Sequence, residues 1–340
     1  MNIGKATQVV KQVAVNSVEK MDVSPQKLSA IAKDVVSFSK EVGERTLTKL
    51  SKNVDFRPTG KEFKYVSLPK GLDIVAGEIK GKLEVPTVAI VDFFDEYGNR
   101  RFGKDVRIPH GKIVSKIMTE GLEDKIGVLA LDARPKDKSS WTAIKEAIEE
   151  IVKLKKEGHD IKALNLSLGE DISYNDISIK MKKTIMKKNI QDCKNDILNY
   201  LKNSQNKEEN EIYKAIQAIN KLVDDGVEIY KASGNNGTDG FDLLALSKVQ
   251  HIVGADDYEF ATKCFANETA KGVYKFKMIY DKVGNFKSAI SDGLNFDIKD
   301  TTKVSKPNFI RKLFKEKEIS INGTSFSCPA KLNKDLKEIL

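Results

Sequence analysis

Several features common in proteins are scarce in this chain, and each scarcity narrows what it can be. The 340 residues include three cysteines, three histidines and one tryptophan. Cys193, Cys264 and Cys328 are widely spaced and form no CxxC pair, which argues against a disulfide framework or a zinc site. No apolar run reaches the roughly 18 residues that span a membrane, and residues 1–20 lack the apolar core of a signal peptide. We therefore expect a cytoplasmic protein without a transmembrane segment.

Clusters of one charge sign accompanied by aromatic residues are also missing. The 58 lysines and arginines exceed the 49 aspartates and glutamates, giving a net charge of +9, but basic and acidic residues alternate along the whole chain. A nucleic-acid-binding protein usually gathers its basic residues on one face or in a motif. Abundant solvated lysine accounts for the excess, so we expect no nucleic-acid partner.

The sequence divides into two regions with different patterns. In residues 1–83, Ser24-Pro25 is typical of a helix start, and apolar residues follow at three- and four-residue steps, which predicts a mainly helical N-terminal extension. It would be a pro-region, a docking arm or a segment that only packs against the domain, and no pro-region motif decides among these. From residue 84, apolar runs typical of buried strands alternate with amphipathic helix patterns. This alternation predicts an α/β domain over 84–340, with a doubly wound, mostly parallel sheet flanked by helices. A lysine-rich segment at about 170–207 is expected to be a helical insertion, with one apolar stripe and a solvated lysine face. A helix that binds a membrane surface or an acidic partner is the alternative.

Two stretches near the start of this domain carry acid–base side chains. The apolar run Val88–Val91 predicts a buried strand that ends in Asp92, at the edge where open α/β sheets bind ligands. His110-Gly111 opens a predicted amphipathic helix. Each residue also has a plain structural interpretation, as a strand-end aspartate and as a packed histidine.

Two later stretches carry an amide and a hydroxyl. A predicted strand at 227–232 leads into a glycine-framed turn that contains Asn235, which is also typical of an ordinary Asn-Gly turn. Near the C-terminus, Gly323 and Thr324 precede Ser325 at the mouth of a predicted helix. A helix N-terminus places partial positive charge beside that hydroxyl. The charged tail after residue 330 predicts that this helix is short or frayed.

Together these four stretches resemble the motifs of the subtilases, the subtilisin-like serine peptidases. Val-Ala-Ile-Val-Asp92, His110-Gly, Ala-Ser-Gly-Asn235 and Gly-Thr-Ser325-x-Ser-x-Pro are similar to the aspartate, histidine, oxyanion and serine motifs of that family, and they occur in its order. The resemblance covers roughly residues 84–330 and implies a subtilisin-like fold.

The sequence also departs from the family pattern. Phe93-Phe94 follows Asp92 where Ser/Thr-Gly is usual. Ile113 stands where the family has a second histidine. No Ala-Pro-Gly element precedes Ser325, and residues 257–320 match poorly.

The resemblance implies a serine endopeptidase acting on a polypeptide substrate through an acyl-enzyme intermediate. Asp92, His110 and Ser325 would form the catalytic triad, and Asn235 would donate a hydrogen bond to the oxyanion. The segments that would lie along the substrate and wall its pocket are Ser167, Leu168 and Gly169, and Ala232, Ser233 and Gly234. Their residue types suggest a pocket open to an apolar side chain.

The resemblance implies no organic cofactor. Many subtilases bind calcium, but no ligand loop is evident here, so no metal site is assigned. The alternative function is that of a catalytically inactive subtilase-fold binding or scaffold protein. The departures favour that alternative, whereas the presence of all four motif residues favours the enzyme. The oligomeric state does not follow from the sequence.

Overall fold

The computed structural model describes residues 86–94, 99–102, 106–122, 125–133, 140–301, 303–304 and 318–340, with three short strands before them, at 55–56, 63–64 and 73–74. The helix predicted after Ser24-Pro25, and with it most of the N-terminal extension, lies outside the described residues. The division at residue 83 and the pro-region or docking role therefore stay predictions.

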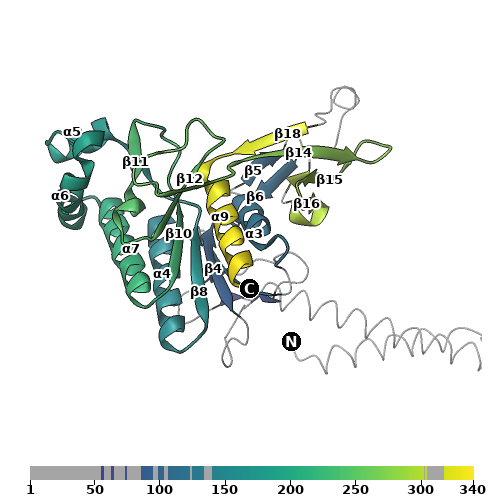
Figure 1. Ribbon diagram of the computed structural model, residues 1–340, viewed down its shortest axis with the longest axis horizontal. Helices are drawn as coiled ribbons and strands as arrows, with labels where there is room; N and C mark the ends of the chain where they lie inside the picture. The colour runs from purple at the N-terminus through teal and green to yellow at the C-terminus, as the bar shows by residue number, and fades with distance from the viewer. Residues whose placement is uncertain are drawn as a thin grey trace, which may run out of the picture. The chain divides into compact units, whose positions relative to one another are not determined.

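A seven-stranded sheet in which every described pair of strands is parallel forms the centre of the domain (Figure 1). Its spatial order is β13 (Glu268–Ala270), β12 (His251–Ala255), β10 (Glu228–Ala232), β8 (Ile161–Leu166), β4 (Thr87–Asp92), β7 (Gly127–Asp132) and β3 (Asp73–Ile74). The chain passes from β4 to β7 on one side and returns to β8 on the other, so the sheet is doubly wound. The predicted fold class is confirmed.

Helices cover both faces of this sheet (Figure 1). Helices α3 (His110–Thr119) and α9 (Thr324–Ile339) pack on one face, and α4 (Ser140–Lys156) and α7 (Lys207–Asp224) pack on the other. In β4, Ala89 and Val91 belong to the core beneath α4 and α7, whereas Val88 and Ile90 belong to the core beneath α3 and α9. Burial of both faces explains why β4 is a continuous apolar run.

An antiparallel sheet that the sequence interpretation did not predict lies beside α3. Its order is β16 (Leu294–Asp297), β15 (Phe286–Ser291), β14 (Val273–Tyr280) and β18 (Glu318–Asn322). Along β14, Tyr274, Phe276 and Met278 are buried and alternate with more exposed residues. They share a core with Ile113 of α3. The position of the family's second histidine is therefore part of an apolar core here.

Three small strand groups complete the described sheets. They are β5 (Asn99–Phe102) with β6 (Val106–Pro109) and β17 (Lys303–Val304), β9 (Asp171–Ser173) with β11 (Gly240–Asp242), and β1 (Asp55–Phe56) with β2 (Phe63–Lys64). The β9–β11 pair is antiparallel and joins residues far apart in the sequence.

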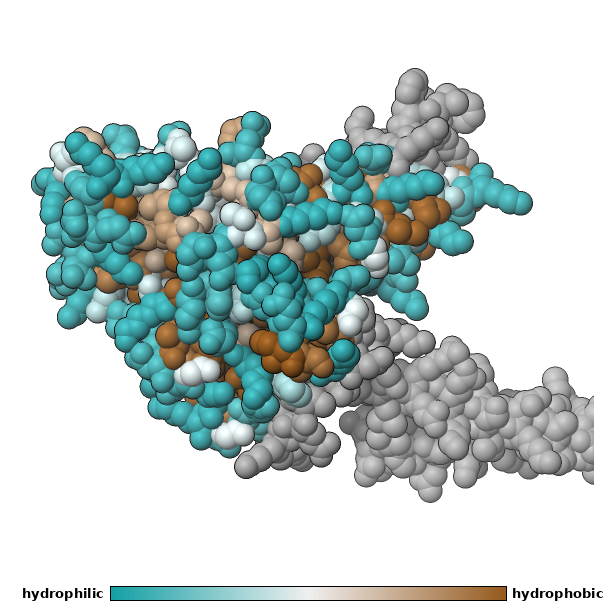
Figure 2. All heavy atoms as spheres, viewed as in Figure 1, coloured by the Kyte–Doolittle hydropathy of each residue, from teal (hydrophilic) through white to brown (hydrophobic). Residues whose placement is uncertain are grey.

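The segment predicted as a helical insertion forms two separate α-helices, so its apolar residues do not lie along one continuous helix face. Helix α5 (Tyr174–Met181) ends at Lys182, whose positive φ of 51° breaks the helix, and a 3-10 turn precedes α6 (Ile190–Asn203). On the face shown in Figure 2, hydrophilic side chains cover most of this region.

The last helix is longer than the charged tail suggested. Helix α9 continues to Ile339. Polar and charged residues of its second half bind residues at the end of α3, so they are not exposed only to solvent. The Asn333 amide donates to the carbonyls of Met118 and Glu120 at the end of α3, and the Lys337 ammonium pairs with Glu120. Within the part of the chain that the structure describes, no helix is long and apolar enough to cross a membrane.

Candidate active site

Asp92 and His110 meet where β4 ends and α3 begins. The His110 Nδ1 lies 2.7 Å from Asp92 Oδ1, and the two residues are 5% and 0% exposed. Asp92 Oδ1 also accepts the Phe93 N–H at 2.6 Å. A buried carboxylate on one ring nitrogen fixes the imidazole plane and favours the tautomer with its proton on Nδ1, which leaves Nε2 as the basic atom.

The Phe93-Phe94 pair, which is unusual for the family, helps to hold the end of β4 against the start of α3. The Gly111 N–H donates to the Phe93 carbonyl at 2.9 Å. The Phe94 ring packs so closely on Gly111 that a Cβ there would lie 2.7 Å from Phe94 Cε1. Glycine after the histidine is therefore required by contact with Phe94. The backbone hydrogen bond between Gly111 and Phe93 and the packing of Phe94 on Gly111 therefore hold the end of β4 against the start of α3.

The start of α9 brings Asn235 close to Ser325. The Thr324 N–H donates to Asn235 Oδ1 at 3.0 Å, and the Gly234 N–H donates to Thr324 Oγ1 at 3.1 Å. Gly323, the N-cap of α9, has a φ of 140°. A Cβ at Gly323 would lie 3.4 Å from Ser325 Oγ, 3.5 Å from Asn235 Oδ1 and 3.8 Å from Asn235 Nδ2. The absent side chain thus leaves a space bordered by one hydroxyl and one amide donor.

Three buried polar atoms of the candidate triad have no hydrogen-bond partner among the described residues. They are Asp92 Oδ2, His110 Nε2 and Ser325 Oγ, and the His110 and Ser325 side chains are each 5% exposed. The Phe326 ring lies 5.4 Å from the His110 ring, so the start of α9 contacts the start of α3. The hydroxyl and the imidazole are not hydrogen-bonded to each other in this structure. Such bonds are often long without substrate and shorten when it binds.

The two predicted substrate segments follow the ends of neighbouring strands. Ser167, Leu168 and Gly169 follow β8, while Ser233 and Gly234 follow Ala232 at the end of β10, and β8 and β10 pair in parallel. Ser167 Oγ accepts a hydrogen bond from the Asn165 amide at 2.9 Å. These segments therefore share one edge of the sheet with Asp92.

Three charged residues at this edge were missed by the sequence analysis. Lys231 is 1% exposed, and its ammonium lies 3.0 Å from Asp242 Oδ2. Burial raises the pKa of the Asp242 carboxyl to about 6, against the opposing effect of Lys231. Asp171 Oδ2 accepts the Asn235 N–H at 2.8 Å. A lysine inside the strand pattern of 227–232 was the signal that could have indicated a buried ion pair.

Cys328, a rival nucleophile by position, is unsuited to that role. It is fully buried, and burial raises the pKa of its thiol to about 12. Its Sγ donates to Asn165 Oδ1 at 3.2 Å. A thiol that stays protonated at neutral pH is a poor nucleophile.

One group of described residues has the composition of a cation site. Ligand atoms of His251, Glu268 and Asp335 lie within 4.8 Å of one another. The Lys331 ammonium lies 3.1 Å from Glu268 and 2.6 Å from Asp335, so a cationic group already pairs with both carboxylates. Calcium prefers six to eight oxygen ligands. This group does not fit the calcium that the family resemblance suggested.

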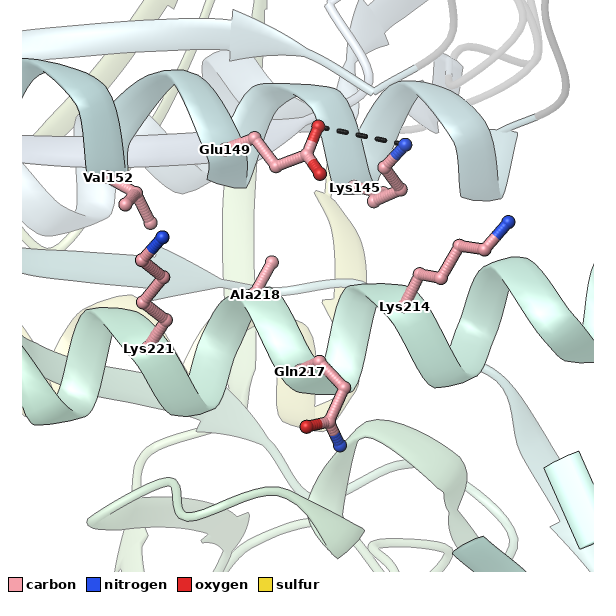
Figure 3. A pocket seen from close by; sticks show the side chains of 7 residues that line it. All are labelled: Lys145, Glu149, Val152, Lys214, Gln217, Ala218 and Lys221. Carbon is pink, nitrogen blue, oxygen red and sulfur yellow. Dashed lines mark ion pairs between the residues drawn. The ribbon is translucent and has the colours of Figure 1, made fainter. Parts of the chain in front are cut away.

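A groove between α4 and α7 lies among solvated charges (Figure 3). Its lining includes Lys145 and Glu149 of α4, which pair at 3.6 Å, and Lys214 of α7, which pairs with Glu211 at 2.8 Å. None of the predicted site residues lines it.

No protein-family model matches the chain, and no curated protein matches its sequence. Solved structures similar to it include the prenylagaramide maturation protease PagA, at 16% identity over 73% of this chain and 72% of that one, with a TM-score of 0.37. A lanthipeptide protease is similar at 15% identity over 73% and 71%, with a TM-score of 0.40. The epidermin leader peptide processing serine protease EpiP of Staphylococcus aureus is similar at 14% identity over 73% and 63%, with a TM-score of 0.39. These likenesses are distant, so the functional argument depends on the residues of this chain.

Proposed function

We propose that this chain is a serine endopeptidase of the subtilisin-like kind that hydrolyses peptide bonds in a polypeptide substrate. The observation that carries the proposal is the buried Asp92–His110 pair, whose imidazole has no partner for Nε2 among the described residues and packs against the start of α9, where Ser325 Oγ also has no partner and the Phe326 ring lies 5.4 Å from the imidazole. A structural histidine would normally satisfy both ring nitrogens when buried. Unsatisfied buried polar atoms are costly, and they suit a site that waits for substrate.

In the proposed reaction, Ser325 Oγ attacks the carbonyl carbon of the scissile bond while His110 Nε2 takes its proton. His110 then protonates the leaving amine, and water hydrolyses the acyl-enzyme by the same steps in reverse. Asp92 acts through its hydrogen bond to Nδ1, holding the tautomer and stabilising the imidazolium.

The negative charge that develops on the carbonyl oxygen would be stabilised at the start of α9. Because Asn235 Oδ1 is held by the Thr324 N–H, its Nδ2 is available on the other side of the amide. The Ser325 N–H, in the first turn of α9, has no carbonyl partner within the helix. These two donors would form the oxyanion hole beside the space that Gly323 leaves.

The experiment that tests the proposal is labelling of the full-length protein with a fluorophosphonate probe, read by intact mass. We expect one adduct on the wild type and none on Ser325→Ala or His110→Ala, provided that circular dichroism shows all three to be folded. A folded wild-type protein that refuses the probe would favour the inactive binding protein, unless residues 1–83 mask the site. Residues 84–340 alone cannot decide this because β3, which begins at Asp73, belongs to the sheet. A variant with a protease cleavage site in the segment 65–72, between β2 and β3, leaves β3 joined to residues 84–340 and tests masking after cleavage.

A further inference from the structure

Two carboxylates lie against the glycines of the predicted substrate segments. A Cβ at Gly169 would lie 1.7 Å from Asp242 Oδ2, and a Cβ at Gly234 would lie 2.0 Å from Asp171 Oδ1. Each glycine therefore leaves room for an approaching carboxylate. The residue types of these segments suggested a pocket open to an apolar side chain, whereas the groups that lie against their glycines and wall this part of the site are acidic.

The β9–β11 pair places these two acids side by side. Its register pairs Asp171 with Asp242, so one carboxylate comes from each strand. Asp171 Oδ2 accepts the Asn235 N–H, and the next backbone N–H toward the N-terminus, that of Gly234, binds Thr324 Oγ1. Asp171 is thus joined through a short hydrogen-bonded path to the residue that precedes Ser325.

The charges at this wall do not balance. The Lys231 ammonium compensates Asp242 at 3.0 Å, and Asp242 Oδ1 accepts the Leu244 N–H at 2.8 Å. Asp171 uses one oxygen for the Asn235 N–H, whereas its Oδ1 is buried and has no hydrogen-bond partner among the described residues. The nearby Asp171 charge also raises the pKa of the Asp242 carboxyl, as expected where negative charge is in excess.

From this arrangement we infer that the site selects a lysine or arginine side chain at P1, the substrate residue whose carbonyl is attacked, and that Asp171 is the specificity-determining residue. The inference rests on the proposed peptidase function and names its substrate class. A guanidinium or ammonium group would bring hydrogen-bond donors and one positive charge to the unpartnered Asp171 Oδ1. Lys231 would keep Asp242 from adding a second uncompensated charge.

The test compares two peptide libraries with randomised flanking positions and a fixed P1 residue, either arginine or citrulline. Citrulline has nearly the shape of arginine but carries no charge, so the ratio of the two kcat/KM values isolates the effect of charge. We expect the full-length wild type to prefer arginine by about 100-fold, because buried charge pairs discriminate strongly against a neutral analogue. In Asp171→Asn, which keeps an acceptor for the Asn235 N–H, the preference should fall to within a few-fold.

Asp239→Asn is the matched control, since it removes the same charge from an exposed residue immediately before β11. It should retain the arginine preference. Equal cleavage of the two libraries by the wild type, or an unchanged ratio in folded Asp171→Asn, would overturn the inference. The wild-type ratio needs no variant, so misfolding of Asp171→Asn does not prevent a decision. Fluorophosphonate labelling separates the two proposals: a labelled enzyme without basic preference refutes the specificity alone, whereas an unlabelled folded protein, with masking tested as above, refutes both.

Discussion

His110 Nδ1 and Asp92 Oδ1 lie 2.7 Å apart, and no solvent reaches the aspartate. The pair is formed by a strand end and a helix start that also share the Gly111–Phe93 backbone hydrogen bond. The separation of the two atoms is therefore set by the backbone and not by two mobile side chains. A base positioned in this way loses little entropy when it acts.

Asp92→Asn tests the role of the carboxylate in this pair. The amide has nearly the same shape but no charge, so it cannot stabilise the imidazolium. If its NH₂ group faces Nδ1, it favours the tautomer with the proton on Nε2 and leaves the Phe93 N–H without its acceptor. We expect kcat to fall by about 10⁴-fold, while the melting temperature changes little. Steady-state kinetics beside thermal unfolding make the comparison, and a loss of less than tenfold would show that Asp92 is a structural strand-end residue.

Asn235→Asp tests the proposed oxyanion donor. Aspartate keeps an acceptor for the Thr324 N–H but removes the amide donor and adds negative charge where the oxyanion would form. We expect kcat to fall by at least about 10²–10³-fold with a smaller change in KM. Asn236→Asp, at the adjacent residue of the same turn, controls for added charge. A loss of similar size in both variants would count against a specific donor.

The order of the strands and helices could be predicted because buried faces place apolar residues at regular intervals in the sequence. Buried parallel strands such as β4 are apolar runs, and α4 repeats its apolar residues at helical spacing. The antiparallel sheet was missed although Tyr274, Phe276 and Met278 alternate with lysines, the pattern of a strand with one buried face. The family resemblance is weak over residues 257–320, so it gives no expectation for the strands of this sheet.

Side chains in local motifs were easier to predict than side chains paired across the fold. Each candidate triad residue stands at a strand end or a helix start with a glycine nearby, which is a local signal. The Lys231–Asp242 pair has no such signal, because it depends on how β10 and β11 are placed in space. The position of Asp171 beside Gly234 likewise could not be predicted, because it depends on where β9 lies in the fold.

Cys328→Ala tests whether Ser325, and not the thiol three residues after it, is the nucleophile. With its thiol buried and the pKa raised to about 12, Cys328 should not react with iodoacetamide in the folded protein at pH 8. Fluorophosphonate labelling of Cys328→Ala should match that of the wild type, apart from a small loss of stability from the removed sulfur. Loss of labelling in a folded Cys328→Ala protein, with labelling retained in Ser325→Ala, would assign the nucleophile to the cysteine.

The buried ion pair predicts strong coupling between Lys231 and Asp242. Lys231→Met leaves the Asp242 carboxylate without its cation, and Asp242→Asn leaves the ammonium without its anion. Each single variant should lose about 3–5 kcal/mol in the free energy of unfolding, whereas the double variant should lose much less, since replacing both members of a buried pair can be nearly neutral. Urea unfolding of all four proteins measures the coupling. Additive losses would show that the two groups do not stabilise each other.

The pKa of Asp242 predicts how this pair responds to pH. Its folded-state pKa of about 6 lies above the ordinary value of 3.8 for an aspartate carboxyl. Between these values the folded protein binds a proton that the unfolded chain does not, so the contribution of Asp242 to stability rises as the pH falls from 7 toward 4 and is lost as the pH rises through 6. Asp242→Asn removes this titration. The free energy of unfolding of the wild type, minus that of the variant, should therefore increase on acidification. A difference independent of pH in urea unfolding from pH 4 to 7.5 would contradict the raised pKa.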